Sequence, residues 1–359
     1  MNRIKLIKKG IQRIARKLPL NSSTEIRLTH LCTQRCRQCS VYERTTEPPY
    51  MSLEQFQIIA ERLRDYGAYI GFISGGEATL VPDLEKILIE ARKTFAIATT
   101  LVTGLYNRRE VIQRIGKVAL ENDINIQTSL DGLGALGDSL RGVTDFSETI
   151  LGHMNWLSEH CNGSKSLLYA NIVLNNLNLD QVPELIHRAN NMGWKTTIGL
   201  YHTLTDTTRA DDELRLHPGK RLDNILKFLD HNPDIMNLNS FIKGIGPFIS
   251  GSQQKICAFV DSPVLSTRMT IMENGDVHLC YGEPIGNILE NDFEQIFSSE
   301  SYQQRIDQYR QCSGCWTTCY TQRYLLVHPA SVKQLLDNFR KVKGIKIGRS
   351  ENGNSKKTD

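Results

Sequence analysis

The sequence predicts an α/β fold, an open partial barrel of six βα units followed by a smaller α+β module. Short β-rich runs alternate with amphipathic helical patterns from about residue 24 to 230, which is typical of parallel βα units. Six such units are too few for a closed eight-stranded barrel. The strands are expected at about 24–29, 69–74, 96–102, 124–130, 167–174 and 195–201.

The helices after the first two strands carry clear end signals. Ser52 and Gln55 fit a capping box at the start of the first helix, and Gly67 ends it. The dipeptide Pro82-Asp83 opens the second helix. The inward-facing residues of these two helices are expected to be Leu53, Phe56, Ile59 and Leu63, then Leu84, Ile87, Leu88 and Ala91.

The last third of the chain predicts a different module. Two apolar runs, 269–272 and 277–279, flank Asn274-Gly275, which is the sequence of a tight hairpin turn. The expected organisation is a basic amphipathic helix at 1–23, the barrel at 24–230, a bridge at 231–256, a smaller cysteine-rich module at 257–325, and a C-terminal helix at 326–359 with a basic disordered tail beginning near Gly344.

Composition and charge exclude several classes of protein. Residues 1–17 carry seven basic and no acidic side chains, and residues 340–359 carry seven basic and two acidic ones, so the +4 net charge hides an acidic body. A nucleic-acid-binding barrel would need positive charge at its site, so no nucleic acid is expected. The nine cysteines and the lack of a signal sequence or a membrane-spanning run predict a cytoplasmic protein with reduced thiols.

The N-terminal segment has an amphipathic pattern with three interpretations. It could contact an anionic membrane surface or a partner through residues 1–18, which would make the protein peripheral at the inner membrane. It could equally be an ordinary helix packed on the barrel, and a transit peptide is a weaker third option. Its apolar stripe is Ile4, Ile7, Ile11, Ile14 and Leu18.

Three cysteines, Cys32, Cys36 and Cys39, follow the first strand in a Cys-x3-Cys-x2-Cys spacing. Three thiolates on a four-iron cluster leave one iron free for an outside molecule. Zinc is the alternative, although structural zinc sites favour paired Cys-x2-Cys knuckles.

This triplet resembles the signature of the radical S-adenosylmethionine (SAM) superfamily. The resemblance implies a partial (β/α)6 TIM-like barrel in which a [4Fe-4S] cluster binds SAM. It also implies reductive cleavage of SAM to a 5′-deoxyadenosyl radical, which abstracts a hydrogen atom from an unactivated carbon. An external one-electron donor, such as flavodoxin or ferredoxin, would supply the electron. Gln38 stands where relatives commonly have an aromatic residue.

Two further motifs extend the resemblance to the SAM site. Ser74, Gly75, Gly76 and Glu77 resemble the family's Gly-Gly-Glu-Pro motif, which binds the amino group of SAM, with Ala78 in place of the proline. The fourth strand ends in a Ser-x-Asp-Gly pattern that faces the SAM ribose in relatives, and an arginine beyond it is expected to meet the carboxylate of SAM. These three residues are Ser129, Asp131 and Arg141.

The late cysteines resemble the auxiliary-cluster module called SPASM or, when shortened, twitch. Five cysteines suffice for one fully ligated cluster, so one auxiliary [4Fe-4S] cluster is expected. The pattern favours four of them as ligands and leaves Cys319 as a spare or as a substitute for one of the four. A zinc ribbon is the alternative for Cys312-x2-Cys315. Cys161 is isolated in the sequence and is not expected to bind a cluster. The four favoured ligands are Cys257, Cys280, Cys312 and Cys315.

The substrate remains open at this level. A small molecule such as a sugar, cyclitol or nucleoside is favoured because one auxiliary cluster is expected and only about 23 residues precede the first strand. The alternatives are maturation of a ribosomally synthesised peptide, a lipid-linked substrate, or an iron–sulfur electron carrier that is not an enzyme. The candidates for proton transfer are Tyr201, His202 and Glu283, for which a structural role is at least equally expected.

Overall fold

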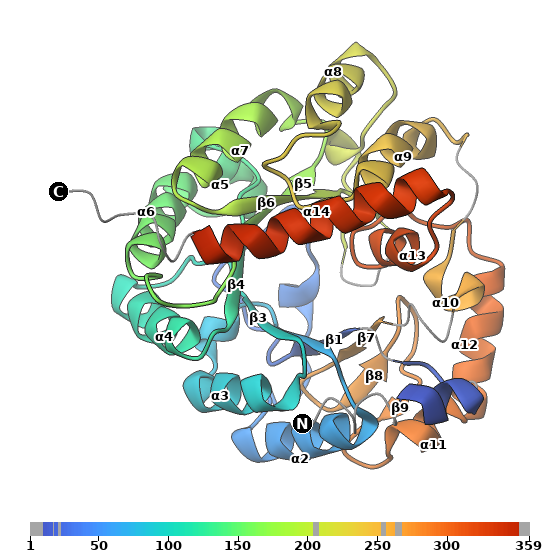
Figure 1. Ribbon diagram of the computed structural model, residues 1–359. Coiled ribbons are helices and arrows are strands. Elements are labelled where there is room, and N and C mark those ends of the chain that lie inside the picture. The colour runs from blue at the N-terminus through green and yellow to red at the C-terminus, as the bar shows by residue number, and fades with distance from the viewer. Residues whose placement is uncertain are drawn as a thin grey trace.

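A parallel barrel sheet and a short antiparallel extension form a single sheet. The computed structural model describes residues 10–16, 18–20, 23–203, 208–252, 256–262 and 268–351, with backbone alone from 344 onward. In these ranges the strand order is β6-β5-β4-β3-β2-β1-β7-β8-β9 (Figure 1). The strands are β1 Ser23–Arg27, β2 Ile70–Ser74, β3 Ala98–Val102, β4 Asn125–Ser129, β5 Leu168–Leu174, β6 Lys195–Leu200, β7 Arg268–Ile271, β8 Asp276–His278 and β9 Gly286–Asn287.

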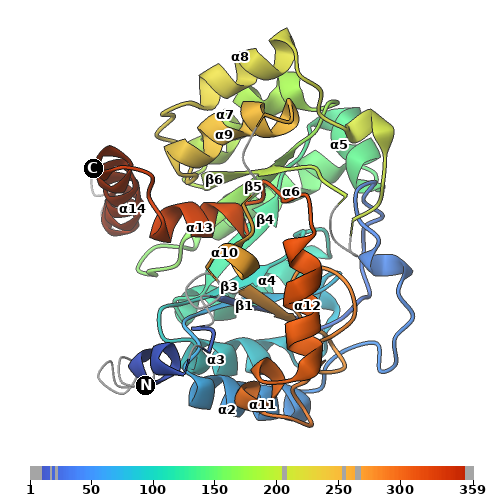
Figure 2. The same cartoon turned by 90° about the vertical axis from the view of Figure 1, so that its right-hand side faces the viewer.

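Helices cover the outside of the curved sheet, as Figures 1 and 2 show. Each barrel strand is followed by a helix that returns the chain to the start of the next strand, which is the right-handed βα pattern. The helices are α2 Leu53–Tyr66, α3 Leu84–Thr94, α4 Arg109–Glu121, α5 Gly134–Arg141, α6 Phe146–Glu159, α7 Val182–Asn191, α8 Lys220–Leu229, α9 Asn239–Ile249, α10 Ala258–Asp261, α11 Phe293–Phe297, α12 Glu300–Arg310, α13 Thr321–Val327 and α14 Val332–Glu351.

The predicted strands and helix signals agree with the structure to within a few residues. Ser52 and Gln55 form the capping box of α2, and Gly67 closes this helix in the left-handed conformation at φ 81°. The inward stripe of α3 is buried as expected. Along β1, Ile26 is fully buried, whereas Glu25 and Arg27 point to the opposite face and remain partly accessible. Charged side chains thus enter the barrel interior from its first strand.

The C-terminal hairpin is present as expected, and it also joins the barrel sheet. Strand β7 pairs in parallel with β1, with Glu25 opposite Thr270, so the hairpin continues the barrel sheet. Glu273, in the turn after β7, is buried and contacts His30 Nδ1 at 3.1 Å. The expected hairpin therefore lies directly beside the loop that carries the first three cysteines.

The structure describes both chain ends in part. The tail does not begin at Gly344, because α14 continues to Glu351; no proline interrupts the backbone hydrogen bonds there. Residues 10–15 are helical, whereas Ile4 and Ile7 of the predicted stripe lie outside the described residues. Among the described helices, none is both long enough and apolar enough to cross a membrane.

Candidate cluster and cofactor sites

The loop with Cys32, Cys36 and Cys39 is anchored on the C-terminal end of α5. The last carbonyls of a helix lack partners within it. Here Arg141 O accepts from Arg35 N at 3.0 Å, and Leu140 O accepts from Arg37 N at 3.0 Å. Gly142, at φ 62°, closes the helix so near the loop that a Cβ there would lie 2.4 Å from Arg35 O. The cysteine loop and α5 therefore hold one another in place.

Asp131 and Arg141 form a buried ion pair beside Cys36. Asp131 Oδ2 also accepts from Gln38 Nε2 at 3.3 Å, and Oδ1 accepts from Val173 N at 2.7 Å. Arg141 Nη1 donates to Cys36 Sγ at 3.6 Å. Burial disfavours the charge of Arg141, but Asp131 and Cys36 outweigh that effect and raise its pKa. Two predicted SAM contacts thus bond to each other and orient the cysteine loop.

The two glycines after β2 permit a close approach of two backbone segments. Gly76 N donates to Thr29 O at 2.6 Å, and Glu77 N donates to Leu31 O at 2.7 Å. A Cβ on Gly76 would lie 2.3 Å from Leu31 O, and one on Gly75 would lie 2.7 Å from Thr29 O. Glycine is therefore needed where this loop lies against the cysteine loop.

Glu77 and Ser74 have protein partners. The buried Glu77 carboxylate accepts from Thr79 N, from the hydroxyls of Thr79 and Thr103, and from Gly104 N, at 2.6–3.0 Å. Ser74 Oγ donates to Glu25 Oε1 at 2.8 Å. Ser129 lies opposite Asn171 in the β4–β5 register. The hydrogen bonds of Glu77 join the loops after β2 and β3.

The chemistry of the first three cysteines fits a metal cluster. Burial raises the pKa of the Cys32 thiol to about 12 and also raises the pKa of Cys39, so these groups would be protonated unless a cation stabilised their thiolates. No three His, Cys, Asp or Glu side chains in the described part of the chain converge as ligands of a single ion. A four-iron cluster needs a wider arrangement, because each thiolate binds a different iron.

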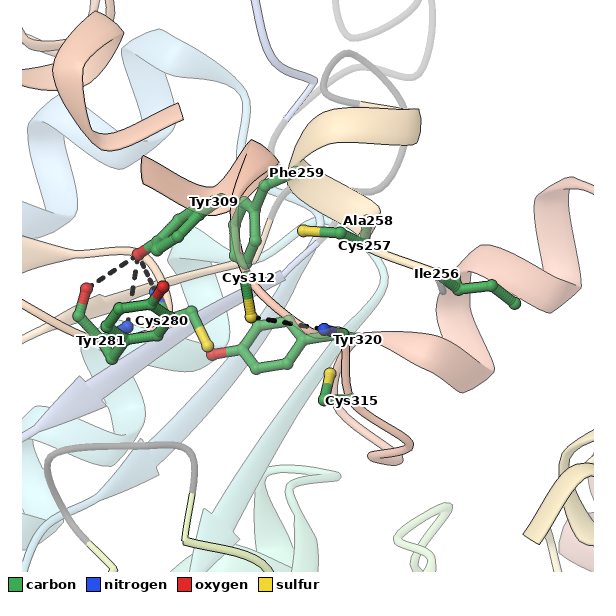
Figure 3. Close-up of a pocket in the computed structure, with 11 residues that line it drawn as sticks. Ile256, Cys257, Ala258, Phe259, Cys280, Tyr281, Tyr309, Cys312, Cys315 and Tyr320 are labelled. Atoms are coloured by element: carbon green, nitrogen blue, oxygen red, sulfur yellow. Dashed lines mark hydrogen bonds between the residues drawn. The ribbon is translucent and has the colours of Figure 1, made fainter. Parts of the chain in front are cut away.

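Four late cysteines surround one aromatic-walled cavity (Figure 3). The space between them measures about 380 Å³. Tyr309 fixes its wall: its hydroxyl accepts from Cys280 N at 3.0 Å and donates to Tyr281 O at 2.9 Å. Burial raises the pKa of the Cys315 thiol to about 11, so a thiolate at this position would need a bound cation to stabilise it. The four cysteines are Cys257, Cys280, Cys312 and Cys315.

Cys319 lies outside this group. It lines a second, larger cavity of about 1390 Å³ that is open to solvent and lies between the barrel and the hairpin. Its sulfur interacts electrostatically with Arg268, whose charge is also stabilised by Glu25. Cys319 therefore does not line the smaller cavity, although Cys280 lines both cavities.

Charged side chains from distant segments line the larger cavity. Glu25 accepts from Arg268 at 2.7 Å and from Arg27 at 3.2 Å. Burial alone would raise the pKa of Glu25, but these arginines outweigh it and lower that pKa to about 2. Arg44 also lines the cavity, and the nearby Arg323 has its pKa lowered to about 10 by burial and by Arg268. Arg27 and Arg268 thus share the Glu25 carboxylate, and with Arg44 and Arg323 four guanidinium groups lie around a cavity that has two carboxylates, Glu25 and Glu283.

The predicted proton-transfer residues separate into two groups. His202 and Glu283 line the larger cavity, and burial lowers the pKa of His202. The Tyr201 hydroxyl instead donates to Arg209 O at 2.7 Å and accepts from Asp211 N at 2.6 Å, which anchors the loop after β6.

Sequence reasoning missed the cavity residues Glu25, Arg27, Arg268 and His278. The signal for the first two was present: they alternate with buried Ile26 along β1, and charges on an inward strand face are unusual in a barrel core. Arg268 had no local signal, because its partner lies 243 residues away. His278 at the end of β8 has its pKa lowered by burial.

Comparison with known families identifies the barrel. A family model for the radical SAM superfamily matches residues 26–189. The chain belongs to the radical SAM superfamily. A second model, the iron–sulfur cluster-binding SPASM domain, matches residues 257–316, a range that includes the four cysteines of the smaller cavity and ends before Cys319. This radical SAM protein therefore uses SAM and a [4Fe-4S] cluster, with iron–sulfur chemistry in its C-terminal domain as well.

Two curated relatives come from Bacillus subtilis (strain 168). The chain is 24% identical over 289 residues to the antilisterial bacteriocin subtilosin biosynthesis protein AlbA, covering 79% of this chain and 60% of AlbA. It is 25% identical over 177 residues to the sporulation killing factor maturation protein SkfB, covering 48% of this chain and 40% of SkfB. The chain thus spans 60% or less of either relative.

Solved structures share the fold. Streptococcus suis SuiB bound to precursor peptide SuiA superposes with a TM-score of 0.60 at 17% identity, covering 83% of this chain and 70% of SuiB. The enzyme anSMEcpe with bound AdoMet and Kp18Cys peptide superposes with a TM-score of 0.61 at 16% identity, covering 92% of this chain and 99% of anSMEcpe. This radical SAM protein has the TIM-like barrel of these structures.

Proposed function

We propose that this radical SAM protein is a maturase that modifies a ribosomally synthesised peptide. The observation that carries the proposal is the open cavity of about 1390 Å³, which lies beside the cysteine-lined auxiliary cavity and shares Cys280 and Tyr320 with it. The names of AlbA and SkfB refer to a bacteriocin and a killing factor, and SuiB and anSMEcpe have been solved with peptides. A peptide substrate therefore has more support than the sugar, cyclitol or nucleoside expected from chain length.

Each set of residues has a proposed role. Cys32, Cys36 and Cys39 would hold the first cluster, and the four cysteines of the smaller cavity would hold the auxiliary cluster. When reduced and bound to SAM, the first cluster supplies a radical able to abstract a hydrogen atom. The ion pair of Asp131 and Arg141 keeps the cysteine loop in position, so that a SAM molecule meets a fixed site.

The residues of the larger cavity would hold the peptide. The arginines around Glu25 provide hydrogen-bond donors for the carbonyl and carboxylate groups of the peptide. His202 and Glu283, which line the same cavity, are the proposed groups for moving a proton from the oxidised substrate. Tyr201 is not proposed for this role, because its hydroxyl already donates a hydrogen bond to Arg209 O and accepts one from Asp211 N.

Two measurements test the proposal. Protein reconstituted without oxygen should form 5′-deoxyadenosine from SAM and dithionite, and Cys36→Ala should abolish it. The protein should then be co-expressed with short open reading frames from its genomic neighbourhood, and one peptide should lose the mass of hydrogen atoms only when Cys36 is intact. No 5′-deoxyadenosine from cluster-loaded protein would leave the electron-carrier alternative. Deoxyadenosine formed with sugars or nucleosides but with no peptide would favour the small-molecule alternative.

A further inference from the structure

The C-terminal helix α14 packs against the protein with its polar side. Asn338 is buried, and its Nδ2 donates to Leu325 O at 3.1 Å. Lys341 Nζ donates to Asn232 O at 2.8 Å. Several apolar side chains point away from the protein, and Phe339 is 66% exposed. Among the side chains that the structure describes on this helix, 332–343, the other exposed apolar ones are Val332, Leu335 and Leu336.

This orientation is the reverse of an ordinary surface helix. A helix on a soluble domain buries its apolar stripe and presents its polar side to water. Residues 332, 335, 336 and 339 follow the i, i+3, i+4, i+7 spacing, so their side chains form one continuous outward stripe. Exposed Leu326 and Val327 at the end of α13 add to the apolar surface. A contiguous exposed apolar patch of this kind is typical of a surface that binds another protein or a membrane.

The N-terminal helical turn shows the same reversal. Arg13 is buried against the ring of Tyr66, with its guanidinium carbon 3.7 Å from the ring centroid, and it donates to Asp65 O at 3.3 Å. Ile11, by contrast, is 62% exposed, and Ile14 is also exposed. Two residues of the predicted apolar stripe, Ile11 and Ile14, therefore face outward, whereas Leu18 packs against the core and Arg13 packs on Tyr66.

These two chain ends lie on one side of the molecule. In Figure 1 both α14 and the N-terminal turn lie toward the viewer, and in Figure 2 both lie at the left-hand edge. The long loop after β1, drawn in blue, lies at the opposite edge in Figure 2. The side with the apolar stripes is thus the side away from the cysteine loop of the barrel.

Positive charge accompanies the apolar residues. Exposed Lys333, Arg340 and Lys343 flank the stripe of α14. The two chain ends, residues 1–17 and 340–359, together carry fourteen basic and two acidic side chains, although the chain as a whole has a net charge of only +4. Apolar side chains between basic ones are the pattern by which a helix lies in the interface of an anionic bilayer.

We propose that this side of the molecule, formed by α14 and the N-terminal turn, binds an anionic lipid bilayer. The outward apolar side chains would enter the headgroup region, and the exposed basic residues beside them, Lys333, Arg340 and Lys343, would contact lipid phosphates. In that orientation the cysteine loop faces away from the membrane, so SAM and a peptide could reach the barrel from the aqueous side. The proposal does not depend on which substrate the enzyme modifies.

Vesicle co-sedimentation of the full-length, cluster-loaded protein tests the proposal. The wild type should sediment with vesicles containing phosphatidylglycerol and not with pure phosphatidylcholine vesicles, and added salt should weaken binding. The double variant Leu336→Ser, Phe339→Ser should lower the bound fraction at least about tenfold. Phe228→Ser, which changes an exposed aromatic residue on α8, is the matched control and should bind as the wild type does.

Other outcomes would overturn the proposal. They are failure of the wild type to bind phosphatidylglycerol vesicles, or equal binding by the double variant. Gel filtration that shows a dimer in the wild type and a monomer in the double variant would assign the stripe to a second copy of the chain instead. Circular dichroism and formation of 5′-deoxyadenosine should be unchanged in the variants, which separates loss of membrane binding from loss of folding or of the proposed activity.

Discussion

Replacement of Gly76 by alanine should remove the first cluster and leave the auxiliary cluster intact. The new Cβ would lie 2.3 Å from Leu31 O and 2.6 Å from His30 O, and both atoms belong to the backbone of the cysteine loop. Relief of this overlap would break the hydrogen bonds from Gly76 N and Glu77 N. Two such bonds at about 1 kcal/mol each, with about 1–3 kcal/mol for overpacking, give a local cost of about 3–5 kcal/mol.

That cost should displace the loop without unfolding the protein, because domains of this kind have about 5–15 kcal/mol of stability. Iron and sulfide analysis should fall from about eight to about four per chain on the four-iron assignment, with loss of 5′-deoxyadenosine formation and unchanged circular dichroism. The control is Gly152→Ala, since no heavy atom lies within 4 Å of the added Cβ. Full iron content and full SAM cleavage in Gly76→Ala would refute the account of this loop.

Three further predictions concern the charges and thiols. Asp131→Ala should destabilise the protein by about 3–5 kcal/mol in urea unfolding, because it leaves Arg141 buried and unpaired. The double variant Asp131→Leu, Arg141→Met should cost much less, because it removes both charges. Equal costs for the single and double variants would contradict the pairing. Cys319→Ser should keep about eight iron atoms and Cys312→Ser should lose about four, and the reverse result would exchange their assignments. Glu25→Gln should lower the free energy of unfolding by a similar amount at every pH from 5 to 8, because the Glu25 carboxylate, with a pKa of about 2, is charged throughout this range. In the wild type this stabilisation is lost only as the pH falls from about 4.5 toward 2. An effect of Glu25→Gln that grows between pH 5 and 8 would show that the pKa of Glu25 is much higher than 2.

Local patterns in the sequence were sufficient for the barrel and for the grouping of the cysteines. The strands follow from alternating β-rich runs, and α2 follows from the side chains of Ser52 and Gln55, because these signals act between neighbours in the chain. The pattern of the late cysteines favoured four of them, with Cys319 as a spare or a substitute, and these four line the smaller cavity.

Local patterns could not predict which way a helix face points or which residues far apart in the chain pair with each other. The periodicity at the N-terminus showed that Ile11 and Ile14 share a helix face, but it could not show that Arg13 faces the barrel. The Gly-Gly-Glu motif indicated a ligand contact for Glu77, but it could not show that the Glu77 carboxylate also accepts hydrogen bonds from Thr103 and Gly104 of the β3 loop. The pairing of Glu25 with Arg268 depends on β7 joining β1, a contact with no local sequence signal.

The most direct test of the central claim is electron paramagnetic resonance of the dithionite-reduced protein, prepared without oxygen, with and without SAM. The wild type should give overlapping signals from two reduced clusters, one of which changes when SAM is added. Cys36→Ala should retain only a signal that SAM does not alter. A wild-type spectrum that SAM leaves unchanged, in protein with full iron and sulfide content, would contradict the assignment of Cys32, Cys36 and Cys39 to a SAM-binding cluster.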